Sequence, residues 1–424
     1  MKGAPQRLAL ALLLLLGGVI ALLSRGDGEP PDDADLMQTA APIPDHENGY
    51  VTLQAASALI QWPDSDALDD RLLAMASGGD WDAELASRAL ADNERALAIF
   101  ARVARNRAFQ SPPDPQPALA PTLGGVQLAR LLAIRARSAT EGGEPAAAVE
   151  DALLALRVGK RIGTDPHGGF RSGQLAMFVG NLALDAIADA LPALELDAAA
   201  TRALARELEA HRVDPAAWRA MLAANYRAER LELLTAARAP AVSDAGAAYA
   251  TPSARRIAGW LPNRYLIQPN NSLAALGAQV RDQQSRANEP CKAGEEQPAA
   301  LQAADLLRPN AIGRRHLAAA QSGARFDVNR CEYDTHVEMT RAALAVRAFE
   351  RDRGAAPPSL AALVPGYLDS APVDGFSGTT LRFDRPRRVV YSIGSDQIDE
   401  GGRAIEGDTE AREPRFALPP LEAS

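Results

Sequence analysis

The stretch from Val337 to Gly402 decides the fold that we expect: VEMTRAALAVRAFERDRGAAPPSLAALVPGYLDSAPVDGFSGTTLRFDRPRRVVYSIGSDQIDEGG. Apolar residues from 343 to 349 recur at helical spacing, and Gly354 with Pro357-Pro358 ends that helix. Two runs, 380–384 and 388–393, have the pattern of a hairpin joined through Arg385-Pro386-Arg387. The stretch therefore predicts a small α+β cassette at 336–402, made of a helix and a short antiparallel hairpin.

The segments LVPGYL, PVDGFSG and YSIGSDQIDEGG occur in an order that resembles the C-terminal half of the type II secretion major pseudopilins. They also resemble a cassette found at the ends of uncharacterised bacterial envelope proteins. The resemblance covers about one sixth of the chain and implies a fold, not an activity. The filament-forming half of a pseudopilin is missing, because no Glu occurs before Glu29.

The loop after the hairpin is the candidate metal site. In pseudopilins the corresponding loop binds calcium, so the resemblance implies a calcium site at Asp396 and Asp399. Glu400 is a weaker match, because GGRAIEGDTE replaces the later acidic part of that loop. Several carboxylates in a flexible loop suit calcium, which takes about six to eight oxygen ligands. The alternative is a solvated acidic turn.

Composition favours helices throughout the chain. Of 424 residues 47% are hydrophobic but only 5% are aromatic, so Ala and Leu supply most of the apolar surface. These residues lose little entropy in a helix, and we expect a mostly α protein of two or three domains. The net charge of -9 argues against nucleic acid as a partner.

The N-terminal segment predicts export. Lys2 and Arg7 precede an apolar run at 8–23, and an acidic segment follows. This charge order predicts residues 1–25 as an inner-membrane anchor with a cytoplasmic N-terminus and the bulk of the chain periplasmic. The run has 16 residues, fewer than the roughly 20 of a spanning helix. A cleaved signal that leaves a soluble periplasmic protein is therefore the alternative.

Cys291 and Cys331 are the only cysteines. In an exported protein two cysteines usually pair, so we expect a disulfide between them. It would close a loop of about 40 residues and contribute roughly 3–4 kcal/mol on the chain-entropy model. A pair of buried free thiols is the alternative.

Between the N-terminal segment and the cassette we expect a linker and a long helical domain. Residues 26–48 are rich in Pro and Asp and predict a disordered linker, and 403–424 predict a flexible acidic tail. The domain at 49–335 predicts a helical-hairpin array. Its helices are expected at 50–60, 66–76, 81–107, 128–140, 145–161, 174–190, 197–211, 215–236 and 269–284.

One pair of these helices, at 128–161, has a repeat-like sequence. LLAIRARSATEGGEPAAAVEDALLALRVGKRI places small residues at close crossing points, then a Gly turn, then a helix that starts at Pro145. It resembles one tetratricopeptide-type hairpin. No period of about 34 residues recurs, so the chain is not identified as a repeat protein.

Motif searches find no catalytic signature. The sequence has no Walker or Rossmann glycine loop, no HExxH and no CxxC. His336 is near Cys331, Glu332 and Asp334, which could gather a metal, but the simpler interpretation is that Asp334 caps a helix that begins there.

Three functions remain open. The first is a non-enzymatic scaffold or adaptor that binds another envelope protein through helical grooves. The second is a hydrolase whose site forms between helices from Asp165, His167, Glu207 and His211. The third, from the resemblance alone, is an accessory component of a secretion or pilus-like apparatus. A polar cleft would favour the enzyme, and an apolar groove would favour the adaptor.

Overall fold

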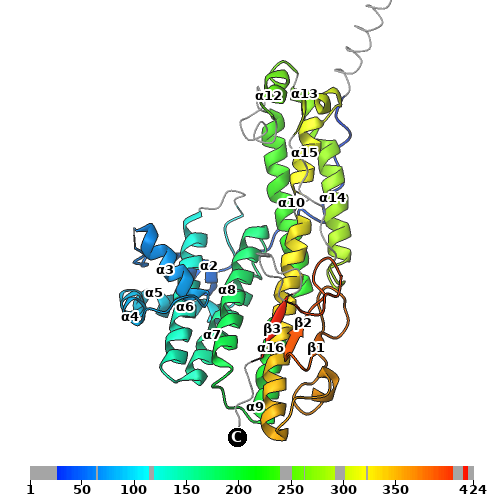
Figure 1. The fold of residues 1–424 in the computed structure, drawn as a ribbon. Helices are drawn as coiled ribbons and strands as arrows, with labels where there is room; N and C mark the ends of the chain where they lie inside the picture. Colours follow the sequence, from blue (N-terminus) through cyan, green and yellow to red (C-terminus); the bar gives the residue numbers. More distant parts are fainter. Residues whose placement is uncertain are drawn as a thin grey trace, which may run out of the picture. The chain divides into compact units, whose positions relative to one another are not determined.

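The computed structural model describes residues 26–63, 65–113, 119–238, 251–261, 263–291, 301–320, 323–403 and 414–418. The chain is mostly helical, with a small three-stranded antiparallel sheet near the C-terminus, so the predicted fold class is confirmed. It divides into two compact units (Figure 1). The large unit contains residues 39–222, 286–294 and 324–424, and the small unit contains 1–38, 223–285 and 295–323.

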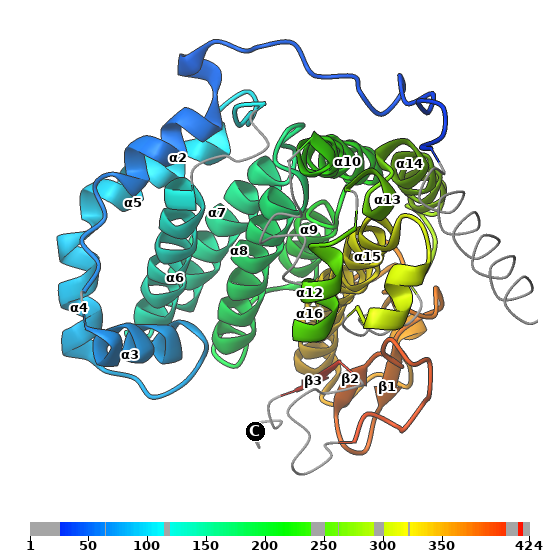
Figure 2. The same cartoon turned by 90° about the horizontal axis from the view of Figure 1, so that it is seen from above.

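The helices of the large unit before residue 210 form one layered group. In both views α6, α7 and α8 lie side by side, and α2 to α4 pack against α6 (Figures 1 and 2). Their bounds are α2 (Gly49–Ser57), α3 (Asp66–Ala76), α4 (Ala83–Asp92), α5 (Glu94–Phe100), α6 (Leu119–Glu141), α7 (Pro145–Ile162), α8 (Gly169–Ala190) and α9 (Ala198–Glu209). Two 3-10 turns, η1 (Asp45–Glu47) and η2 (Ala101–Arg105), accompany them.

Local signals explain several of these helix starts. The side chains of Asn48, Asp82 and Asp197 accept hydrogen bonds from the first turns of α2, α4 and α9. Pro145 occupies the first position of α7, where its missing N–H leaves no bond unmade.

The prediction of one long helix over 81–107 is wrong. The helix breaks at Asn93, which separates α4 from α5 and η2. The Asn93 side chain accepts a bond from Gln61 N at 2.8 Å and donates one to Gln61 O at 2.9 Å. This pair of bonds ties the break to a loop 32 residues earlier, which local sequence periodicity does not reveal.

The helix α16 (Gly323–Arg353) belongs almost entirely to the large unit and is its most buried element. From Tyr333 to Glu350 nearly every residue is buried, including the charged residues Asp334, Glu338 and Arg341. The predicted domain boundary after residue 335 lies inside this helix. The helical domain and the cassette therefore share α16.

The cassette ends in the predicted hairpin and a strand that was not predicted. After η4 (Leu360–Leu363), strands β1 (Arg382–Asp384) and β2 (Val389–Tyr391) pair antiparallel, with Phe383 opposite Val390. β3 (Arg415–Ala417) then pairs with the other edge of β2. The prediction of a flexible tail is therefore wrong for residues 415–417, because a non-local strand pairing orders them.

The described part of the small unit is mostly helical. α10 (Pro215–Arg238) starts in the large unit and continues into the small one, where α12 (Pro252–Ala258), α13 (Asn263–Leu266), α14 (Pro269–Ser285) and α15 (Ala311–Ala320) follow. Its core includes Tyr265, Leu266 and Ile312, together with Leu306 of the 3-10 turn η3 (Ala303–Leu307).

The first described residues of the chain also belong to the small unit. Sequence analysis expected a disordered linker over 26–48. In the structure Asp33 accepts bonds from Tyr226 Oη and Arg230 Nε, both at 2.9 Å, and Leu36 is only 1% exposed. Residues 33–36 thus have fixed partners on α10.

No helix within the described residues is long and apolar enough to cross a membrane. The apolar run at 8–23, predicted to be an anchor or a signal, lies outside the described residues.

The buried ion pair of α16 leads to a stability prediction. Arg341 Nη1 lies 2.6 Å from Glu338 Oε2, and the two side chains are 1% and 2% exposed. Arg341→Met leaves the Glu338 carboxylate without this partner, so we expect the free energy of unfolding to fall by about 3–5 kcal/mol. Urea unfolding monitored by circular dichroism would measure the change.

The exposed pair Arg88–Glu84, with side chains 65% and 85% exposed, provides the control. Arg88→Ala should lower the free energy of unfolding by at most about 0.5 kcal/mol. Equal losses for the two variants would contradict the role that we assign to the buried pair.

Candidate functional site

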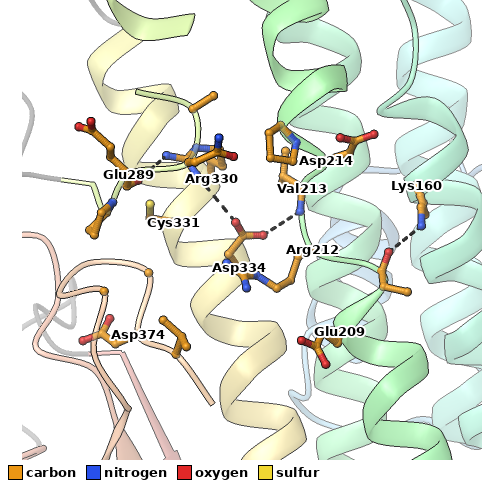
Figure 3. A pocket seen from close by; sticks show the side chains of 18 residues that line it. Lys160, Glu209, Arg212, Val213, Asp214, Glu289, Arg330, Cys331, Asp334 and Asp374 are labelled. Carbon is orange, nitrogen blue, oxygen red and sulfur yellow. Dashed lines mark hydrogen bonds and ion pairs between the residues drawn. The ribbon is translucent and has the colours of Figure 1, made fainter. Parts of the chain in front are cut away.

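A cleft of about 620 Å³ opens within the large unit (Figure 3). Five separate parts of the chain line it: the end of α7, the connection from α9 to α10, residues 287–290, α16 and the loop 373–378. Its charged lining residues are Lys160, Glu209, Arg212, Asp214, Glu289, Arg330, Asp334 and Asp374. The cleft is therefore polar and carries both signs of charge.

Asp334 lies at the centre of the cleft wall on α16. Its side chain accepts a hydrogen bond from Val213 N at 2.8 Å, and its second oxygen lies 4.0 Å from Arg330 Nη1 (Figure 3). Asp334 is only 4% exposed, and this burial raises the pKa of its carboxyl. The interpretation of Asp334 as a helix cap is wrong, because α16 begins at Gly323 and continues through this position.

Arg330, one turn earlier on α16, is fixed by several contacts. Its guanidinium donates to Asp327 Oδ1 at 3.2 Å, to Glu289 O at 3.3 Å and to Cys291 Sγ at 3.2 Å. It also lies over the Trp218 ring, 5.3 Å from the centroid. Arg330 thus joins residues 289–291 to α16 and α10.

The next turn of α16 is an ion-pair network beneath the cleft. Glu338 lies between Arg341 at 2.6 Å and Arg212 at 3.5 Å, and Val373 N donates to Glu338 at 3.3 Å. Arg341 reaches onward to Glu209 of α9 at 2.7 Å. Burial raises the pKa of Glu338, and the neighbouring Arg341 opposes that rise.

The loop 373–378 lies beside α16 in the cleft lining, and Asp374 organises it. Asp374 is fully buried and accepts bonds from the Phe376 and Ile393 amides and from the hydroxyls of Ser377 and Ser392. The Ser377 hydroxyl is thus engaged within the turn.

The same loop packs directly on α16. A Cβ at Gly375 would lie 2.8 Å from Cys331 O, so glycine permits this close approach.

The predicted disulfide is confirmed. Cys291 and Cys331 are bonded at 2.00 Å across a separation of 40 residues, and they pack with Phe376 in one buried cluster. Cys291 N also donates to Gly375 O at 3.1 Å. The bridge therefore holds three of the five cleft-lining segments at one point: residues 287–290, α16 and the loop 373–378.

A second cavity, of about 70 Å³, lies under the connection from α9 to α10. It is lined mainly by apolar side chains of α8 and α10, with His211 at its edge. His211 is 7% exposed and its Nδ1 has no hydrogen-bond partner within the described part of the chain. Burial, reinforced by the Lys160 charge, lowers the pKa of His211 to about 4.

The four residues of the hydrolase hypothesis do not form one constellation. Asp165 is buried and accepts bonds from the Ser111 and His167 amides and the Ser172 hydroxyl, and so joins two loops. His167 Nδ1 contacts Ser111 O at 2.8 Å. Glu207 forms an ion pair with Arg157 on α7.

The predicted metal sets are not gathered either. Cys331 is in the disulfide, and His336 contacts Asn181 and Asp185 of α8 instead of Asp334. Asp396 caps Ile398 N, and Asp399 contacts Tyr391, Gly401 N and Arg382. Within the described residues Asp396, Asp399 and Glu400 do not bring their carboxylate oxygens within 4.8 Å of one another. Calcium binding there stays a prediction.

One other group has metal-ligating atoms close together. Glu229 and Glu232 of α10 and His316 of α15, all in the small unit, have ligand atoms within 4.8 Å of one another. His316 Nε2 lies 2.6 Å from Glu229 Oε2, a distance that a hydrogen-bonded ion pair explains.

Arg212, Arg330 and Asp374 line the cleft but were not predicted as site residues. Arginine carries no signal in this chain, because only three of its 45 basic residues are lysines. Asp374 lies in the PVDGFSG segment, where its position before a glycine indicates a turn and not a cleft wall.

No family model matches the chain, and neither a curated protein nor a solved structure matches it.

The disulfide at the cleft gives a prediction on stability. Replacing Cys291 and Cys331 together with Ala should lower the free energy of unfolding by about 3–4 kcal/mol, because the unfolded chain regains the freedom of a 40-residue loop. Chemical unfolding of both proteins measures the difference. Wild-type protein isolated from its own host envelope with two alkylatable thiols would show that the bridge does not form there.

The buried His211 predicts acid sensitivity. Its folded pKa of about 4 lies below the value near 6.5 in the unfolded chain, so the unfolded state binds the proton more tightly between those values. Stability from this group is present above about pH 6.5 and is lost as the pH falls toward 4. Between pH 7 and pH 4.5 the free energy of unfolding of wild type should fall by about 2 kcal/mol more than that of His211→Gln. Urea unfolding at the two pH values measures the difference.

His46, whose side chain is 80% exposed, provides the matched control. His46→Gln should lose as much stability in acid as wild type. If His211→Gln also follows the wild-type pH profile, His211 is not the group that responds.

Proposed function

We propose that this protein is a non-enzymatic adaptor of the bacterial envelope, and that the cleft of the large unit receives a segment of another envelope protein. The supporting observation is that the charged side chains deepest in the cleft are bonded to the protein's own groups. Asp374 accepts four bonds, Arg330 donates to three acceptors, and Asp334 accepts from Val213 N.

Such a wall is suited to recognition. A wall built for covalent catalysis would instead need a nucleophile within hydrogen-bond reach of a base, and a third group that orients the base. Side chains that are fixed in advance lose little entropy when a partner binds, and their outer edges offer donors and acceptors of both charges. The volume of about 620 Å³ accommodates a few residues of a peptide.

The envelope location is part of the proposal. The disulfide supports an oxidising compartment such as the periplasm. The apolar run at 8–23, with Lys2 and Arg7 before it, favours an inner-membrane anchor with a cytoplasmic N-terminus. A cleaved signal would leave the same large unit in the same compartment.

The cleft is polar, and by the criterion set from the sequence this favours an enzyme, so a hydrolase is the second candidate. Asp334 is a buried carboxyl in a cleft, and burial raises its pKa. Carboxyls with a shifted pKa are common at catalytic sites. The Asp334 oxygen nearest to Arg330 is only weakly engaged, because it lies 4.0 Å from Nη1.

Site-specific photo-crosslinking in host membranes tests the adaptor. A photo-reactive residue replaces Asn288, an exposed residue of the cleft lining, in the full-length protein. We expect it to crosslink one envelope protein, and Ala210→Trp, which places a large side chain in the cleft, to reduce that product at least tenfold. A photo-reactive residue at Glu84, whose side chain is 85% exposed on α4, should not give the product.

Ala91→Trp, at an exposed alanine of α4, is the matched control and should leave the product unchanged. Crosslinking that persists in Ala210→Trp would reject the cleft as the binding site. Asp334→Asn separates the two candidates, because an adaptor releases its partner chemically unchanged. A partner whose mass differs between wild type and Asp334→Asn would show that the cleft is catalytic.

A further inference from the structure

Three large apolar side chains are exposed on adjoining segments of the small unit. Trp260 is 89% exposed, Leu307 71% and Ile257 44%. Ile257 and Trp260 lie at the end of α12, Leu307 ends η3, and α12 packs against η3. The same segments bury Ala258 and Leu306 in the core of the small unit. We call the exposed side chains of Ile257, Trp260 and Leu307 the tip.

Hydrogen bonds place the tip at the end of the small unit where α14 begins. Asn310 N donates to Tyr265 O at 2.7 Å, and Asn310 Oδ1 accepts from Gln268 N at 2.8 Å, one residue before α14. Leu307 is three residues from Asn310, a reach of at most about 10 Å. Figure 1 shows α12 and α13 together at this end of α14 and α15.

The chain enters the small unit at the same end. The Asp27 carboxylate accepts bonds from Asn270 N at 2.8 Å and Asn271 N at 3.0 Å, in the first turn of α14. Asn270 Nδ2 in turn donates to Gly28 O at 2.8 Å. The apolar run at 8–23 ends four residues before Asp27, which spans at most about 14 Å.

Among the described residues at this end of the small unit, exposed arginines outnumber exposed acidic residues, although the whole chain has a net charge of -9. Three exposed acidic residues are described at this end, and two of them accept hydrogen bonds: Asp27 from the first turn of α14, and Asp305 from Gln302 N at 2.8 Å. The third is Glu29. The exposed arginines of this end are Arg255, Arg256, Arg264, Arg308 and Arg314.

We propose that the tip rests on the membrane surface, with Trp260 and Leu307 in the interfacial region of the bilayer and the arginines near anionic lipid phosphates. Trp is favoured at this depth because its ring is apolar and its N–H is polar, and each Arg near an anionic surface adds attraction. A lipid surface fits better than a protein groove, because the proposed anchor ends four residues before Asp27. Asp27 is bonded to the first turn of α14, the end at which the tip lies. The cleft takes no part in this contact.

Trp260 provides the probe. The chain has four tryptophans and none within residues 1–25, so quenching by lipid reports the folded part. Full-length protein is reconstituted into phosphatidylcholine–phosphatidylglycerol vesicles with and without brominated acyl chains. We expect brominated lipid to quench the fluorescence, and Trp260→Phe to reduce that quenching at least twofold. Arg255→Glu with Arg256→Glu should also reduce it, because the charge attraction is lost.

Leu307→Ser and Leu123→Ser are a matched pair of substitutions. Leu123 is 60% exposed on α6 of the large unit, so Leu123→Ser should keep wild-type quenching while Leu307→Ser reduces it. If wild-type Trp260 is not quenched by brominated lipid and stays open to aqueous acrylamide in vesicles, the proposal is overturned and the tip is left for a protein partner.

Flotation with the vesicles tests the anchor separately. Protein that does not float, yet is quenched when brominated vesicles are added, would reject the anchor and support the tip. Protein that floats without quenching would support the anchor and overturn the tip.

Discussion

The large unit depends on buried charges along α16. Glu338 and Arg341 are almost without solvent contact, and an unpaired buried charge is costly, so each requires partners from other elements. Those partners come from α9, from Arg212 and from Val373 N of the cassette. Glu350 binds Arg388 beside β2 in the same way. α16 can therefore be buried only when helices, loop and sheet are all in place.

Sequence predicted the elements whose signals are local. α3 and α7 begin and end close to the predicted bounds, because Pro145 and the glycine turns mark them directly. The hairpin of β1 and β2 was predicted from two short runs around Pro386. The break at Asn93 and the strand β3 were not, because each depends on a partner distant in sequence: Gln61 for the first and β2 for the second.

The site was far less predictable than the fold. The disulfide followed from the presence of only two cysteines, which leaves one pairing. The cleft, by contrast, is assembled from segments between Lys160 and Gly378, and no spacing in the sequence brings these together. Asp334 had the sequence context of a helix start. Its bond to Val213 N is visible only when α16 is known to run through it.

The contacts that stabilise this cleft also limit its chemistry. A carboxylate whose oxygens already accept several bonds is a poor base, because its lone pairs are occupied and its charge is compensated. Asp374 accepts four such bonds. Asp334 accepts fewer bonds, since one of its oxygens accepts from Val213 N and the other lies 4.0 Å from Arg330 Nη1. The same disulfide and hydrogen bonds hold the walls of the cleft in one arrangement, and a pre-organised wall loses little entropy when it binds a ligand.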